Sequence, residues 1–397
     1  MNPRSIVMLS GTVLVAACQD SPVLVSPVAL ATPLDSYVIT DLGTLGGTFA
    51  NADQINVVGH LAGRAQNAAG EMRAFLWDGV AMRDLGPAIT CCAGVYLNDN
   101  DQVAWTGTTA DGSTHAFLWD NGAARDLGTL GGSLSRVSGV NNQGQVVGTS
   151  SVDTASSHAF LWQDGTMTDL GTLGGANSEA TAINDKGQVV GTSALDSTLS
   201  HAFLWQDGAM TDLGSLGGRS VAVAINKAGW IVGTSRTGND FLPSYAVLWR
   251  EGELISLGTL PGDLYSTAVS VNSGGEITGL NCRELGCDER HPFVWKAGQM
   301  TALDPDYPFP YWQGPAAIND DGLVAGNRRV NSHTSVGVVW ETNGVGQNLG
   351  TLGGAQSGAS AINQFGWVAG SAETTSGERH AVLWLRVAAP AIVATTP

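Results

Sequence analysis

The sequence predicts an all-β protein: an eight-bladed β-propeller of four-stranded antiparallel blades, with the ring closed by an N-terminal strand. Three observations carry this prediction. They are a repeat of 42 to 46 residues, four short strand-like runs in each repeat, and complementary defects at the two ends of the repeated region. The composition agrees, because 53 glycines among 397 residues and only 13% charged residues suit short strands and tight turns.

Two residues mark the repeat. A tryptophan ends the motif HAFLW or a variant of it, and an asparagine follows an aliphatic residue. The tryptophans are Trp77, Trp119, Trp162, Trp205, Trp249, Trp295, Trp340 and Trp384. The asparagines are Asn56, Asn98, Asn141, Asn184, Asn226, Asn272, Asn319 and Asn363.

Each repeat contains runs of the types EATAIN, GQVVGTS, HAFLW and AMTDLG, and the turns NDKG and QDG predict tight hairpins. In HAFLW, alternate side chains point to opposite faces, and both sets are largely apolar. We therefore expect blades that pack on both sides. Small residues recur in the first run and predict that it lies nearest the axis: Ala180, Ala182, Ala222, Ala224, Ala359 and Ala361.

The two ends of the repeated region complement each other. No DLG strand follows Trp384, whereas YVITDLGTLGG at 37–47 is a fourth strand with no unit before it. Pairing the two would seal a ring over 37–387 and leave 388–397 as a tail, whereas an open solenoid would leave both edges exposed.

The motifs HAFLW, DLGTLGG and AIN..GQVVG resemble the HAF repeat of predicted extracellular bacterial proteins, over about residues 37–384. The sixth and seventh copies depart most, with HPFVW and VGVVW in place of HAFLW. The resemblance implies export and a repeat fold, and it implies no activity.

Residues 1–18 are typical of an export signal, with Arg4 before an apolar run that is too short to span a bilayer. The ending LVAAC resembles a bacterial lipobox, which implies lipid attachment at Cys18 and a tether over 19–36. Gln19 resembles the pattern for outer-membrane routing. An ordinary signal peptide with a chance cysteine is the alternative. We expect an exported, monomeric protein in the cell envelope, at the cell surface or outside the cell, which contacts membrane only through its lipid.

Charge and cysteines narrow the functions further. A net charge of −17 argues against a nucleic-acid partner, and no motif predicts a cofactor or a metal. Cys282 and Cys287 are predicted to form a disulfide within one loop. Cys91 and Cys92 form either a vicinal disulfide or two free thiols, and a zinc site is less favoured because the spacing is wrong.

Several polar residues recur at one place in the repeat, and equivalent residues in different blades lie too far apart to share an ion. We therefore interpret them as packing and hydrogen-bonding residues, together with the repeated asparagines. They are His115, His158, His201, His291 and His380 of HAFLW, and Asp126, Asp169 and Asp212 of DLG.

Function is expected where the copies differ. Connections between the second and third strands, and between units, vary in sequence and share the face opposite the tight hairpins. The most unusual connection carries Tyr307, Phe309, Tyr311 and Trp312 between prolines. These aromatic residues either stack a sugar or dock a peptide, or else they plug the ring.

The variable loops also carry seven carboxylates, which are either solvated charges or paired groups for glycosidic cleavage: Asp111, Asp153, Asp196, Asp240, Asp288, Glu289 and Glu373. The sequence therefore favours a non-catalytic binding or scaffolding module for a glycan or protein ligand. A carbohydrate-active hydrolase or lyase is the alternative, and a structural surface-layer protein is a third.

Overall fold

The computed structural model describes residues 36–90, 94–238, 243–284, 289–305, 314–331, 333–341 and 343–387. They belong to one compact unit, Ser36–Ala388. The described residues form strands and turns and contain no α-helix. They therefore include no helix that is long and apolar enough to cross a membrane. The predicted signal peptide and most of the tether, with Cys18, lie outside the described residues.

Six separate four-stranded antiparallel sheets follow one another along the chain, and in each sheet the strands pair in sequence order. The first three are β6(Val95–Leu97) to β9(Ala123–Asp126) through β7(Val103–Thr108) and β8(Thr114–Asp120); β10(Ser135–Val140) to β13(Thr166–Asp169) through β11(Val146–Ser151) and β12(Ser157–Gln163); and β14(Ser178–Ile183) to β17(Ala209–Asp212) through β15(Val189–Ala194) and β16(Ser200–Gln206).

The other three sheets continue the same pattern. They are β18(Ser220–Ile225) to β21(Glu253–Gly258) through β19(Ile231–Arg236) and β20(Ser244–Arg250); β22(Tyr265–Val271) to β25(Gln299–Ala302) through β23(Ile277–Cys282) and β24(Arg290–Lys296); and β26(Pro315–Ile318) to β29(Gly346–Asn348) through β27(Val324–Arg329) and β28(Ser335–Trp340).

A seventh sheet has eight strands from both ends of the unit. Its first part is β2(Gly46–Ile55), β3(Leu61–Asn67), β4(Met72–Trp77) and β5(Met82–Ala88), and its second part is β30(Gly353–Ile362), β31(Val368–Thr374), β32(Arg379–Val387) and β1(Ser36–Gly43). The N-terminal strand β1 pairs antiparallel with β32, with Ile39 opposite Trp384, as the complementary ends predicted. One parallel residue pair, Phe49 with Arg379, joins the two parts.

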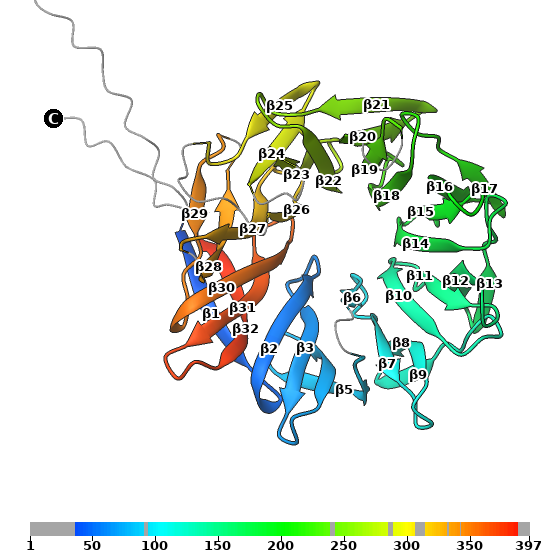
Figure 1. Ribbon diagram of the computed structural model, residues 1–397. Helices are drawn as coiled ribbons and strands as arrows, with labels where there is room; N and C mark the ends of the chain where they lie inside the picture. The colour runs from blue at the N-terminus through cyan, green and yellow to red at the C-terminus, as the bar shows by residue number, and fades with distance from the viewer. Residues whose placement is uncertain are drawn as a thin grey trace, which may run out of the picture. The chain divides into compact units, whose positions relative to one another are not determined.

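Within this unit the sheets lie around a common centre (Figure 1). First strands such as β10 and β14 face the centre, whereas fourth strands such as β13 and β17 lie at the periphery (Figure 1). The small residues of the first strands therefore stand where the sheets converge, as expected.

Neighbouring sheets pack through both faces of their strands. In β16, Phe203 is fully buried in one cluster with Val147 and Leu161 of the preceding sheet. Its neighbour Ala202 is fully buried in a different cluster, with Trp249 of the following sheet. The alternation of apolar residues in HAFLW thus builds two interfaces from one strand.

One departure from HAFLW has a simple backbone explanation. Pro292 lies inside β24, a strand with partners on both sides, although proline cannot donate to a sheet. At the equivalent place in β12, the Ala159 N–H does not bond to a neighbouring strand but donates to the Ser178 hydroxyl at 2.9 Å. Proline therefore enters this position without breaking a hydrogen bond between strands.

Candidate functional site

The eight repeated asparagines are buried and hydrogen-bonded in a circle. Each side-chain amide donates to the backbone carbonyl of the asparagine in the next repeat, over 2.8 to 3.3 Å, and Asn363 donates to Asn56. Each side-chain oxygen also accepts N–H groups of its own turn, as Asn184 does from Lys186 and Gln188. The asparagines therefore have the structural role that the repeat predicted, because each fixes its own turn and the next.

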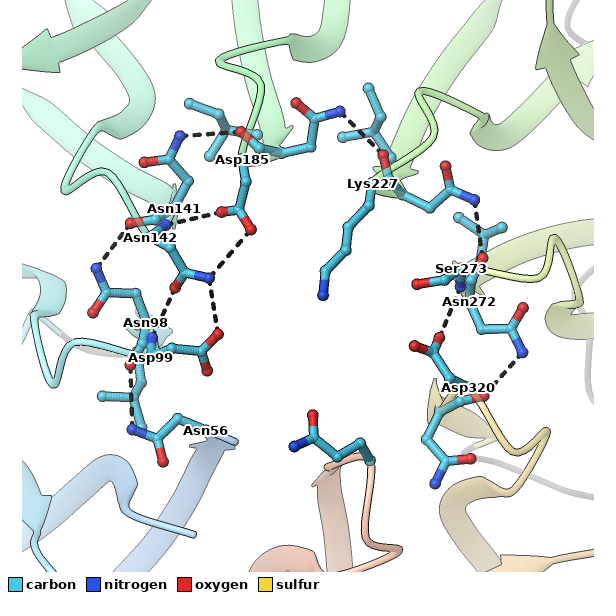
Figure 2. Close-up of a pocket in the computed structure, with 18 of the residues that line it drawn as sticks. Asn56, Asn98, Asp99, Asn141, Asn142, Asp185, Lys227, Asn272, Ser273 and Asp320 are labelled. Carbon is cyan, nitrogen blue, oxygen red and sulfur yellow. Dashed lines mark hydrogen bonds between the residues drawn. The ribbon is translucent and has the colours of Figure 1, made fainter. Parts of the chain in front are cut away.

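These turns surround a central cavity of about 360 Å³, which is within the size range of small-ligand sites (Figure 2). Its apolar wall comes from the aliphatic residue before each asparagine, such as Ile183 and Ile225. The cavity lies on the face of the tight hairpins, opposite the variable face that the sequence favoured.

The residue after each asparagine differs from repeat to repeat, and we call these eight places the rim positions. Seven of them line the cavity with polar side chains, and Val57 holds the eighth place. The seven are Asp99, Asn142, Asp185, Lys227, Ser273, Asp320 and Gln364. The cavity therefore combines three carboxylates, one ammonium, two amides and a hydroxyl on a repeated backbone frame.

Hydrogen bonds link several rim positions in one direction around the cavity (Figure 2). The backbone N–H of Val57 donates to Asp99 at 3.1 Å, that of Asp99 to Asn142 at 2.8 Å, and that of Asn142 to Asp185 at 3.0 Å. The Asn142 amide also donates to the carboxylates of Asp99 and Asp185, at 2.8 and 3.2 Å. These carboxylates are thus held in place before any ligand arrives.

The Ser273 N–H makes the same kind of bond to Asp320, at 2.9 Å. No group of three or more His, Cys, Asp or Glu side chains in the described part of the chain is arranged to hold a metal ion. The rim is therefore a set of hydrogen-bonding groups.

The repeated histidines form local pairs with aspartates. His115, His158 and His201 place Nδ1 within 2.8 to 3.0 Å of the DLG carboxylates Asp126, Asp169 and Asp212. His380 makes the same contact with Asp41 of β1, and His291 makes it with Asp263. These contacts match the structural role that we expected for the histidines.

The acidic residues of the variable loops bind their own loops. Asp111 accepts from the Thr109 hydroxyl and the Ser113 N–H, Asp153 from the N–H groups of Ala155 and Ser156, and Asp196 from Thr198 and Leu199. These hydrogen bonds lower the pKa of all three carboxyls.

Two further loop carboxylates are also engaged. Glu373 accepts the N–H groups of Ala355 and Gln356, each at 3.0 Å, and Glu289 pairs with Arg283. Asp240 and Asp288 lie outside the described residues.

Several predicted site residues cannot be placed. Tyr307, Phe309, Tyr311 and Trp312 lie outside the described residues, as do Cys91, Cys92 and Cys287. Cys282 is buried and disulfide-bonded. Its pairing with Cys287 stays a prediction.

Sheets of four antiparallel strands, repeated around a centre, define this chain as an all-β propeller. No protein-family model matches it, and neither does any curated protein sequence. Among solved structures, it is similar to the β-propeller domain of the Trilobed protease from Pyrococcus furiosus, with 10% identity, 85% of this chain and 93% of that chain covered, and a TM-score of 0.49.

It is also similar to the acylaminoacyl peptidase of Pyrococcus horikoshii, with 10% identity and a TM-score of 0.49 over 84% of this chain. The match spans only 59% of the peptidase. The lectin of Aleuria aurantia, in complex with Fucα1-6GlcNAc, matches with 12% identity and a TM-score of 0.35, covering 78% of this chain and 96% of the lectin. At these identities and TM-scores, the likenesses bear on neither ligand nor activity.

Proposed function

We propose that this protein is a non-catalytic binding propeller and that it holds a glycan in the central cavity. The rim positions carry the proposal, because seven of the eight are polar and their side chains vary among the repeats, whereas the asparagine beside each of them never changes. Carboxylates accept hydrogen bonds from hydroxyl groups, whereas ammonium and amide groups donate to them. A ligand with many hydroxyls can use both kinds of group at once.

The proposal includes an eight-bladed ring. We count the eight-stranded sheet as two blades, since only the pair Phe49 and Arg379 connects its two parts. In this scheme β1 completes the last blade beside β32, and the circle of eight asparagine hydrogen bonds runs once through every blade. A closed ring would hold the rim positions at fixed separations, which reduces the entropy lost on binding.

Binding without turnover is favoured over glycosidic cleavage. A general acid needs a carboxyl whose pKa is raised towards neutral pH. Hydrogen bonds instead lower the pKa of Asp111, Asp153 and Asp196 in the variable loops.

The cellular setting of the proposal rests on the sequence. The resemblance to HAF repeats and to a lipobox at Cys18 supports a monomeric protein that is exported and attached by lipid to the cell envelope, where a surface glycan would be its ligand. A protein ligand remains the alternative from the sequence.

A glycan array with the purified protein tests the proposal, followed by analysis of the bound glycans for cleavage. We expect binding without new reducing or unsaturated ends. Ser273→Trp places an indole at the rim and should abolish binding, because the indole occupies space that the ligand needs. The fold should tolerate this change, since Ser273 bonds to Asp320 only through its backbone N–H. Ala228→Trp is the matched control, since Ala228 is exposed in a neighbouring turn and does not line the cavity. Equal loss in both variants, or none in either, contradicts a central site.

A further inference from the structure

We infer, on the basis of the proposed function, that the central cavity selects an acidic sugar of the uronate class and that Lys227 binds its carboxylate. The inference rests on an interruption in the hydrogen bonds of the rim. Such a bond runs from the N–H groups of four rim positions to the side chain of the next one, and the run that begins at Val57 ends at Asp185, before Lys227.

The interruption follows from side-chain chemistry. Asn142 donates its backbone N–H to Asp185, but the Asp185 N–H meets Lys227, whose ammonium cannot accept a hydrogen bond. Within the described residues, the N–H groups of Asp185 and Lys227 have no hydrogen-bond acceptor, the Ser273 N–H donates to Asp320, and the N–H groups of Asp320 and Gln364 form a second gap. Of these two gaps, the one at Asp185 and Lys227 combines two backbone donors with a positively charged side chain.

Lys227 adds a third donor at that place. Its side chain extends into the middle of the cavity (Figure 2), and no other described residue forms a hydrogen bond or ion pair with its ammonium. The other two lysines of the chain are engaged, since Lys186 donates to the Ala228 carbonyl at 3.2 Å and Lys296 pairs with Glu276. Among the three, the lysine in the cavity is the one left for a ligand.

The neighbouring carboxylates suit the rest of such a ligand. Both oxygens of Asp185 already accept hydrogen bonds from Asn142, and those of Asp99 accept from Val57 and Asn142. Sugar hydroxyls can donate to the lone pairs that remain, and Asp320 offers a third carboxylate across the cavity. A neutral sugar offers no anion to the ammonium and the two N–H groups, whereas the carboxylate of a uronate can accept hydrogen bonds from all three.

Titration calorimetry with glucuronic acid and glucose tests this inference. We expect glucuronic acid to bind the wild-type protein about ten- to hundredfold more tightly than glucose, because a charged hydrogen bond separates the two sugars. Lys227→Met should remove the difference and leave weak binding of both. Lys186→Met is the matched control on the same face and should keep it. Inorganic sulfate should compete weakly with glucuronic acid for the wild-type protein.

Three results would overturn the inference. The first is that the wild-type protein binds the two sugars with equal affinity and that Lys227→Met binds them as tightly as the wild type does. This result would leave the proposed function standing. Sulfate that binds as tightly as glucuronic acid would exclude a role for the hydroxyls. No binding of either sugar would also overturn it, and the glycan array would then decide separately whether the proposed function fails.

Discussion

The side-chain amide of Asn363 donates a hydrogen bond of 3.2 Å to the backbone carbonyl of Asn56, and this bond joins the last repeat to the first. The Asn363 side-chain oxygen also accepts the N–H groups of Phe365 and Trp367. Asn363→Ala should therefore lower the free energy of unfolding by about 2–4 kcal/mol, because one buried and two partly buried hydrogen bonds are lost. Urea denaturation measures the change.

Gln364→Ala is the control for this prediction. Gln364 is exposed and lies beside Asn363, so its replacement should change the free energy of unfolding by less than about 0.5 kcal/mol. If the two variants unfold at the same urea concentration, the circle of asparagines does not stabilise the fold.

The strand β1 should stabilise the whole domain, because it completes a sheet with the last strand, β32. A chain that begins at Thr44 loses the partner of β32, together with Tyr37 and Ile39, which pack against the neighbouring apolar cluster. We expect the loss of at least about 3 kcal/mol and a lower melting temperature than a chain that begins at Ser36. Identical melting curves for the two chains would show that β1 is dispensable.

Acid should weaken the variable loops. Hydrogen bonds from Thr198 hold the pKa of Asp196 below its usual 3.8, and similar bonds lower the pKa of Asp111 and Asp153. A carboxyl with a lowered folded-state pKa stabilises the fold above its unfolded pKa, and this contribution disappears as the pH falls through the folded value. A triple variant with Asn at these positions should be less stable than the wild type at pH 7, and the difference should shrink as the pH falls below 3.8. A constant difference would exclude this linkage.

The disulfide of Cys282 should close a short loop. A non-reduced digest analysed by mass spectrometry should contain a peptide that links Cys282 to Cys287. Reduction should lower the free energy of unfolding by only about 2 kcal/mol, because the closed loop is short. A peptide that joins Cys282 to Cys91 or Cys92 would contradict the predicted pairing.

Much of the fold could be predicted because its marker residues recur. Trp384 without a following strand, and the unpaired run that contains Ile39, predicted the contact that β1 makes with β32. Local patterns succeed for the six four-stranded sheets because each of them is built from consecutive strands. The histidine pairs show the limit. Ala302 stands where Asp212 stands in an earlier repeat, and Asp263, from the preceding connection, supplies the carboxylate for His291. No pattern near His291 in the sequence indicates that Asp263 replaces the DLG aspartate as its partner.

The cavity was missed for a different reason. Function was expected at the connections that vary most in sequence, whereas the asparagine turns are short and uniform in their motif. The signal lay in the residue after each asparagine, which changes from Asp185 to Lys227 to Ser273 in successive repeats. Whether that side chain faces the centre depends on the geometry of the turn and on the arrangement of the sheets, which the sequence alone does not show.

The central claim is that the cavity between the asparagine turns is the ligand site. A crystal structure of the protein with a glycan that it binds tests this most directly. We predict density for a sugar ring within hydrogen-bonding distance of Lys227 and Asp320. Density for the sugar only among the variable connections on the opposite face, with the central cavity free of it, would contradict the claim.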